Sequence, residues 1–115
     1  DFVVVALHSG HQYADFKSVG TESSAHAAID AGADLVFCHH PHILEGFEFY
    51  KGKLIAWSLG NCIFDQDFLT SFASGVLRVV YEGPVLLEAR FLIELKFLNG
   101  RDRLKGLPVH SLIVY

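Results

Sequence analysis

The sequence predicts an α/β protein in which a parallel β-α-β unit is followed by antiparallel strands. Residues 2–38 have the pattern strand, loop, helix and strand, residues 46–58 have that of a hairpin, and apolar and polar residues alternate in the C-terminal half. A composition of 51% hydrophobic and 19% charged residues is that of a globular chain and excludes disorder. Because no repeat or linker-like stretch divides residues 1–115, we expect a single unit.

The first strand is expected at residues 2–7, a continuous apolar and β-branched run typical of strands that are covered on both faces. The more polar residues 8–20, which include Gly10 and Gly20, are expected to form a loop at the carboxyl end of that strand.

A helix is expected next, capped by Thr21 or Ser23 and stopped by Gly32. Residues 33–38 are apolar again and predict a second buried strand. Strands joined through a helix usually form a right-handed crossover, so we expect these two strands to be parallel members of one sheet.

A hairpin is expected next, and the C-terminal half of the chain is expected to be antiparallel. Residues 46–50 and 54–58 predict two strands joined by a turn at Lys51-Gly52-Lys53. Residues 65–72 fit either a loop or a short helical turn. Further strands, the second of them ending at the turn Asn99-Gly100, are expected at residues 75–82, 91–98 and 109–115.

Charge and composition exclude several classes of function. The net charge is −4 and the nine Lys and Arg residues are scattered, so no nucleic-acid partner is expected. No apolar run approaches the roughly 18 residues of a membrane-spanning helix, and no basic flank precedes the first run, so these residues predict neither a transmembrane helix nor a signal peptide.

Cys38 and Cys62 are expected to be reduced, buried thiols, with one disulfide as the alternative. Because methionine is absent and a strand pattern starts directly after Asp1, we expect a piece of a longer chain.

Four of the seven histidines follow the two predicted strands: His8 follows the first, and His39, His40 and His42 follow the second. The carboxyl ends of parallel strands lie at one edge of a sheet, where ligands bind in open α/β folds. Pro41 favours extended backbone at His40, and an extended His-x-His pair projects both rings to one face. Neutral imidazole is a good ligand for Zn, Mn and Fe, so we predict a metal site here, with metal-free surface histidines as the alternative.

The other polar candidates have simpler interpretations. His11 and His110 are expected to be solvated or hydrogen-bonded loop residues, and His26 is expected on the polar face of the helix. Gly60-Asn61 predicts a turn, and Asp65 could cap a helix or support a site.

Three blocks of sequence carry a family resemblance. They are Leu7-His8-Ser9-Gly10, then Asp30-Ala31-Gly32-Ala33-Asp34-Leu35-Val36 running into His39-His40-Pro41-His42, then Trp57-Ser58-Leu59-Gly60-Asn61-Cys62-Ile63-Phe64-Asp65. Together they resemble the CapA family of capsule and poly-γ-glutamate synthesis proteins, within the calcineurin-like metallophosphoesterase superfamily. The usual family forms are H-W-G-x-E, D-A-G-A-D-x-V-x-G-H-H-P-H and Y-S-L-G-N-F-x-F-D. The resemblance implies the C-terminal half of a metallophosphoesterase-like layered α/β sandwich.

The resemblance also implies a set of site residues. His8, His40 and His42 match metal ligands, and the complete domain would hold two divalent metal ions (Mn, Fe or Zn). The Asp and Asn ligands of that site would come from an upstream half that these residues lack. His39 matches the other histidine of H-H-P-H, and His8 and His39 are the catalytic candidates, since a histidine near the leaving group would act as general acid.

Asn61, Asp65 and Gln12 match positions that would support this site. The sequence departs from the family forms at two of its motif positions after the first strand, where Ser9 replaces Trp and Gln12 replaces Glu. The second change removes a carboxylate from the site. Two cysteines are further departures, because Cys38 stands where the family has Gly and Cys62 where it has Phe.

The implied function is hydrolysis of a phosphate ester by metal-bound hydroxide, in bacterial capsule or poly-γ-glutamate biosynthesis. The expected partners are a phosphate-containing small molecule or polymer precursor, the missing N-terminal half of the domain, and a membrane-associated polymer synthase complex. The resemblance suggests a bacterial protein that is extracytoplasmic or membrane-associated. One alternative is a non-catalytic metal-binding scaffold of a polymer synthesis and export complex. Another is a mononuclear metal-binding domain that is complete as it stands.

Overall fold

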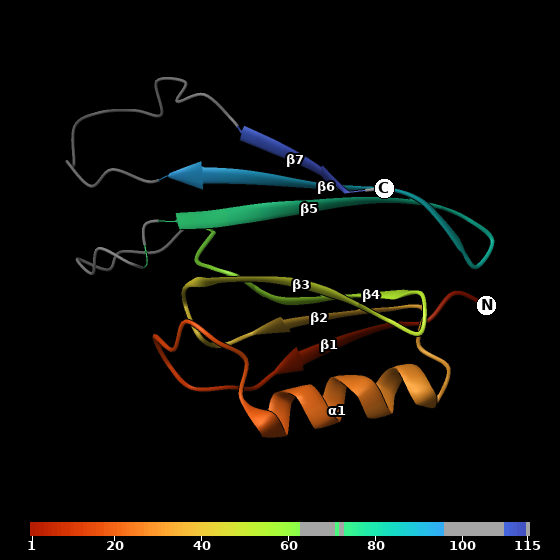
Figure 1. Cartoon of the computed structure of the whole chain (residues 1–115), viewed down its shortest axis with the longest axis horizontal. Coiled ribbons are helices and arrows are strands. Elements are labelled where there is room, and N and C mark those ends of the chain that lie inside the picture. Colours follow the sequence, from red (N-terminus) through yellow and green to blue (C-terminus); the bar gives the residue numbers. More distant parts are fainter. Residues whose placement is uncertain (63–70, 72, 96–109, 115) are drawn as a thin grey trace.

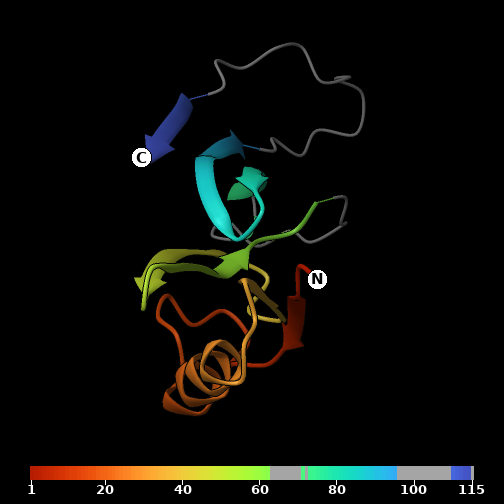
Figure 2. The same cartoon turned by 90° about the vertical axis from the view of Figure 1, so that its right-hand side faces the viewer.

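The computed structural model describes residues 1–62, 71, 73–95 and 110–114, which form one helix and two sheets (Figure 1). The helix α1 (Val19–Asp30) covers one face of the first sheet, and the second sheet covers the other face (Figures 1 and 2). The strands are β1 (Val4–His8), β2 (Leu35–His39), β3 (Leu44–Tyr50), β4 (Lys53–Leu59), β5 (Ala73–Glu82), β6 (Val85–Leu95) and β7 (His110–Val114).

The first sheet has the strand order β1-β2-β4-β3 and confirms the predicted α/β class. β1 pairs parallel with β2, β2 pairs parallel with β4, and β3 returns antiparallel to β4. The predicted hairpin is confirmed. Its two-residue turn has positive φ at both positions, Lys51 (50°) and Gly52 (77°), as the twist of antiparallel strands favours.

The second sheet is antiparallel, in the order β5-β6-β7. The strand predicted at 75–82 is confirmed, but the prediction of the next strand at 91–98 is wrong at its start, because β6 begins at Val85. A tight turn at Gly83-Pro84 already pairs Glu82 with Val85, so the chain re-enters the sheet at once. The segment left open at 65–72, apart from Ser71, and the turn predicted at Asn99-Gly100 lie outside the described residues.

The core consists of two apolar layers, one on each face of the first sheet. Successive side chains of a strand point to opposite faces of the sheet, so the inner strands β2 and β4 contribute residues to both layers. Between α1 and the sheet lie Ala25, Ile29, Ala33, Val36, Cys38, Ile55 and Trp57. Between the two sheets lie Leu35, Leu54 and Ala89, with Phe47, Leu77, Val79 and Leu86 packed against them.

Strand β1 departs from the expectation that both of its faces are buried. It lies at the edge of the sheet, and its exposure alternates, with Val5 and Leu7 packed towards α1 and Val4 47% exposed. The second sheet packs over Leu35 and Leu54 of β2 and β4, so it covers the inner strands rather than this edge. The apolar run therefore predicted the strand correctly, but the prediction that both of its faces are buried is wrong.

Helix α1 begins earlier than predicted. Its cap is Ser18, whose hydroxyl accepts a hydrogen bond from the Thr21 N–H at 3.1 Å, whereas the sequence suggested Thr21 or Ser23 as the cap. The helix ends at Asp30, and Gly32 follows with a φ of +106°, as expected of a helix stop. Across the described part of the chain, no helix has the length and apolar character needed to span a membrane.

Candidate metal centre

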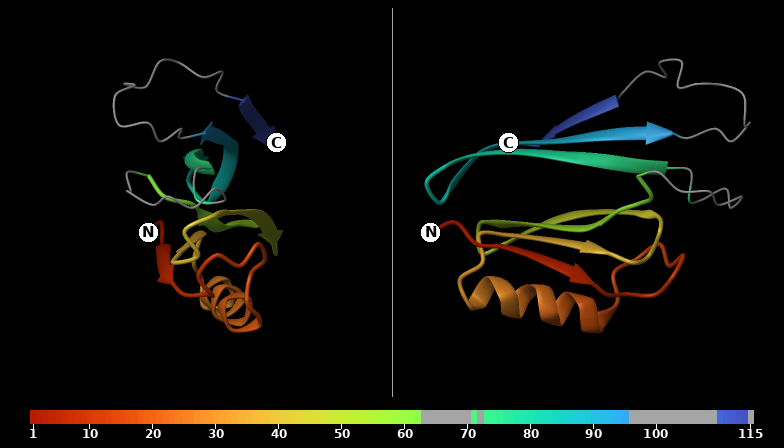
Figure 3. Two further views of the ribbon diagram at one scale, coloured as in Figure 1. Left: turned by 90° about the vertical axis from the view of Figure 1, so that its left-hand side faces the viewer. Right: turned by 180° about the vertical axis from the view of Figure 1, so that it is seen from behind.

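The strand-end histidines, His8, His39, His40 and His42, lie where β1 and β2 end. Both strands point to the same end of the molecule, and the loop that follows β1 lies there too (Figure 3, right). His8 and His39 are partners in the parallel register, and the Ser9 N–H donates to the His39 carbonyl at 3.0 Å. The predicted convergence of the two strand ends is thus present in the structure.

His8 and His40 form the tightest contact of this group. Nδ1 of His40 lies 3.1 Å from Nε2 of His8, and the ring centroids are 4.9 Å apart. Two nitrogens bound to one tetrahedral Zn²⁺ at about 2.0–2.1 Å are separated by about 3.3 Å. The spacing observed between these nitrogens is therefore close to that of two ligands sharing one metal ion.

The backbone of the His-x-His segment differs from the prediction. His40 has a φ of 112° and His42 a φ of 64°, so neither residue is extended. These positive values are rare for residues other than glycine and typically cost about 1–3 kcal/mol each. Such a conformation persists only where contacts with the surrounding structure enforce it. The constraint comes from Pro41 between them, which is fully buried and whose carbonyl accepts the Tyr13 N–H at 2.8 Å. The loop after β1 therefore holds the two histidines in a conformation that local sequence disfavours.

The His42 ring lies further from the His40 ring than the His8 ring does. Its ring centroid is 6.1 Å from that of His40. No group of three possible ligands within 4.8 Å of one another, among the described residues, includes these histidines. This separation fits ligands of two adjacent metal ions better than it fits two ligands of one shared ion.

His42 has a defined partner in Asn61. Nδ1 of His42 lies 2.8 Å from Oδ1 of Asn61, and Asn61 is 7% exposed. Asn61 follows Gly60, which has a φ of +70° and forms an isolated bridge with Ser74 at the start of β5. A Cβ at Gly60 would lie 2.5 Å from the Ala73 carbonyl oxygen. Gly60 and Asn61, predicted as a turn, instead form the point where the second sheet meets the site, through the bridge of Gly60 to Ser74.

His39 lies beside His8 and is half-buried. Its ring packs edge-on against Phe37, with centroids 5.4 Å apart. Burial, and secondly the nearby His8, lower the pKa of His39 below its usual value. The neutral imidazole is therefore favoured at this position.

The remaining predicted residues lie apart from these contacts. Gln12 and His11 are exposed in the loop after β1, as expected for His11. Asp65 lies outside the described residues. Cys38 and Cys62 are both free thiols, but only Cys38 is buried, so the expectation of burial is wrong for Cys62.

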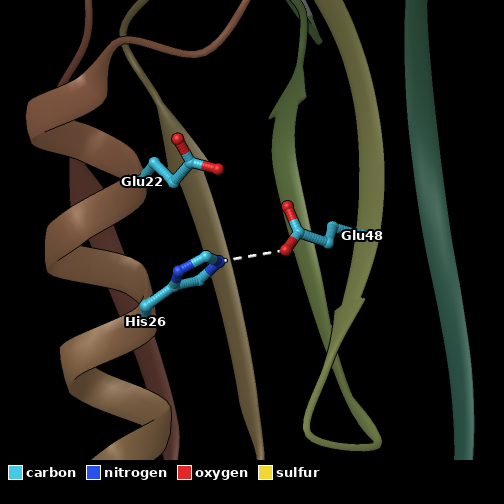
Figure 4. Close-up of side chains that lie close together, drawn as sticks. All are labelled: Glu22, His26 and Glu48. Carbon is cyan, nitrogen blue, oxygen red and sulfur yellow. Dashed lines mark hydrogen bonds and ion pairs between the residues drawn. The ribbon is translucent and has the colours of Figure 1, made fainter.

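A second cluster lies between α1 and β3 and was not predicted. Glu22, His26 and Glu48 bring three possible ligand atoms within 4.8 Å of one another (Figure 4). Nε2 of His26 lies 3.0 Å from a Glu48 oxygen, and its ring stacks on Tyr50 at 3.8 Å between centroids. His26, expected on the polar face of the helix, is thus half-buried in a network of charged and aromatic side chains. The spacing of Glu22 and His26, four residues apart on the helix, was the available signal.

This second cluster already contains its own cation. The Lys17 ammonium forms ion pairs with Glu22, at 2.8 Å, and with Glu48, and it also lies 4.4 Å from the centroid of the Trp57 ring. The hydrogen bond from Lys17 is the main cause of the lowered pKa of Glu48. We interpret the cluster as an ion network that joins α1 to β3.

Comparison with known proteins places the chain in a family. The model of the bacterial capsule synthesis protein PGA_cap matches residues 1–66, more than half of the chain. The chain belongs to the PGA_cap family. The matched segment ends just after Gly60-Asn61, so it includes the four strand-end histidines and Asn61.

Three relatives of this PGA_cap chain have names that refer to capsule, PGA or polyglutamine synthesis. The capsule biosynthesis protein CapA of Bacillus anthracis is 42% identical over 78 residues, which are 68% of this chain and 19% of that protein. The PGA biosynthesis protein CapA of Bacillus subtilis (strain 168) is 41% identical over 78 residues, 68% of this chain and 20% of that protein. A probable polyglutamine synthesis accessory protein of Mycobacterium tuberculosis (strain H37Rv) is 31% identical over 83 residues, 70% of this chain and 22% of that protein. The chain thus spans about a fifth of the length of these relatives.

Proposed function

We propose that this chain supplies the histidine side of a metal-dependent phosphoesterase site, in a protein that acts in bacterial capsule or poly-γ-glutamate synthesis. The observation that carries the proposal is the meeting of His8 and His40 at 3.1 Å between ring nitrogens, beside His42. Two imidazole nitrogens at the spacing of shared ligands are a donor set suited to Zn, Mn or Fe. The names of the relatives support the biological role.

His8, His40 and His42 would hold two divalent ions together with ligands from other parts of the longer protein. Such ions supply Lewis acidity towards a phosphate oxygen and lower the pKa of water. His8 and His39, adjacent in register at the strand ends, would face the bound phosphate. One of them would act as general acid near the leaving group, and the lowered pKa of His39 works against its protonation there.

The substrate would be a small molecule or polymer precursor that carries a phosphate ester. By the family resemblance, a membrane-associated polymer synthase complex is the proposed partner of the whole protein. A protein in such a complex that keeps the metal site without turnover is the alternative role. The exposed Gln12, where the family pattern has Glu, favours that alternative, because it leaves one carboxylate fewer near the loop.

The test is metal-dependent hydrolysis of bis(p-nitrophenyl) phosphate by the full-length protein that carries this chain. We expect activity with Mn²⁺, Fe²⁺ or Zn²⁺ that is lost on chelation. His40→Ala should lower it at least as much as the roughly 10–100-fold typical of changes around a metal ligand. His11→Ala is the matched control, because that histidine is exposed in the neighbouring loop. Tight metal binding without turnover would favour the scaffold, and absence of metal binding would refute both roles.

A further inference from the structure

The contact between His42 and Asn61 determines more than the position of one ring. The acceptor atom of Asn61 in this contact is its amide oxygen, which carries no hydrogen, so the hydrogen must lie on Nδ1 of His42. In a neutral imidazole the lone pair is then on Nε2. We propose that Asn61 is a positioning residue that holds His42 in the Nδ1–H tautomer and so presents Nε2 as the ligand atom.

The buried surroundings of Asn61 keep its amide in place. Gly60, just before it, donates its N–H to the Ser58 hydroxyl at 3.3 Å and bridges to Ser74. The close approach of the Ala73 carbonyl leaves no room for a side chain at Gly60. The backbone that carries Asn61 is therefore held between β4 and β5, which fixes the position from which its side chain reaches His42.

His42 itself is constrained as well. Its own φ of 64° sets the direction of the side chain, and the Tyr13 ring lies against it at 5.9 Å between centroids. The His8–His40 contact provides a contrast within the same site. It joins two imidazole nitrogens, either of which can donate, so it selects no single tautomer for either ring. Asn61 therefore selects one tautomer of His42, whereas the described His8–His40 contact selects none.

The part of this proposal that concerns a metal ion rests on the proposed function, but the tautomer does not. The experiment therefore begins with the metal-free chain of 115 residues, labelled with ¹⁵N at histidine, at about pH 8.5 where imidazole is neutral. A two-bond ¹H–¹⁵N correlation spectrum reports which ring nitrogen carries the hydrogen, and His42→Gln assigns the signal. We expect the Nδ1–H form for His42. An Nε2–H form would overturn the proposal outright, whether or not the protein is an enzyme.

Two variants test the role of Asn61. Asn61→Asp keeps an oxygen acceptor, so the Nδ1–H form should persist. Asn61→Leu has similar bulk but no acceptor, so the ring should shift towards the Nε2–H form that imidazole favours in water. In the full-length protein that carries this chain, Zn²⁺ affinity measured by calorimetry should fall by about 10–100-fold in the Leu variant and stay within a few-fold in the Asp variant.

These results separate the two proposals. An unchanged tautomer in Asn61→Leu would overturn the positioning role, and so would loss of the Nδ1–H form in a folded Asn61→Asp. If the Leu variant does not fold, the wild-type and Asp spectra still decide the tautomer. A chain with the expected tautomer whose parent protein binds no metal would refute the proposed function and leave the role of Asn61 in orienting His42 intact.

Discussion

Gly60→Ala tests whether the second sheet holds the Gly60-Asn61 segment as closely as the structure shows. An alanine at a φ of +70° costs about 1–2 kcal/mol in backbone conformation alone. Its Cβ would also lie 2.5 Å from the Ala73 carbonyl oxygen and 3.2 Å from the Ser74 Cα. Both atoms belong to backbone, so the strand must move, and overpacking of this kind adds about 1–3 kcal/mol. The expected loss in free energy of unfolding is therefore about 2–5 kcal/mol.

Gly52→Ala is the matched control, since Gly52 has a similar φ of +77° and an added Cβ there meets nothing within 4 Å. Urea denaturation of both variants isolates the steric part, because the conformational cost is common to the two. Gly60→Ala should be less stable than Gly52→Ala by about 1–3 kcal/mol. It should also disturb the His42 tautomer, which Gly52→Ala should not. Equal losses of stability would refute the close approach of β5 to this segment.

Two further predictions concern titratable groups. Burial raises the pKa of Glu45 to about 7, so its protonated form stabilises the fold fully below the ordinary carboxyl pKa near 4.5, and this contribution is lost as the pH rises through about 7. Glu45→Gln should therefore be more stable than wild type by about 1–3 kcal/mol at about pH 8.5 and equal to it at about pH 4.5, as measured by urea denaturation. A difference that does not depend on pH would contradict this. Cys38 is buried, with its pKa raised to about 11, whereas Cys62 is exposed, so an aromatic disulfide reagent at about pH 8 should modify one thiol quickly. Cys62→Ser should abolish the fast reaction, and two fast thiols in the folded chain would be inconsistent with the structure.

Local pattern was sufficient for most of the fold. The apolar runs before His8 and His39 predicted two parallel strands, and the Lys51-Gly52 turn predicted the hairpin, because period and turn chemistry act over a few residues. One error lies where separate parts of the chain compete. Ser18 caps the helix in place of Thr21, and the Thr21 hydroxyl instead bonds Ser9 in the loop after β1, at 3.0 Å.

The candidate site was likewise predicted only in part. Topology alone predicted that His8 and the histidines after β2 would meet, since parallel strands end at one edge. It did not predict the positive φ at His40, because neighbouring residues favour extended backbone there and the restraint comes from the buried Pro41 and its contact with Tyr13. The sequence pattern likewise did not predict the partner of His26, because Glu48 is 22 residues away along the chain.

The sequence by itself determined the class of fold, the edge at which the strand-end histidines gather, and the family to which the chain belongs. These depend on residue type and spacing along short segments, which are local properties. Only the tertiary structure decided the backbone of the His-x-His segment, the ion network around Lys17 and the contact of Asn61 with His42. Each of these joins segments that are distant in sequence, and packing between layers can hold a residue in a conformation that costs it 1 kcal/mol or more, about the size of most local preferences.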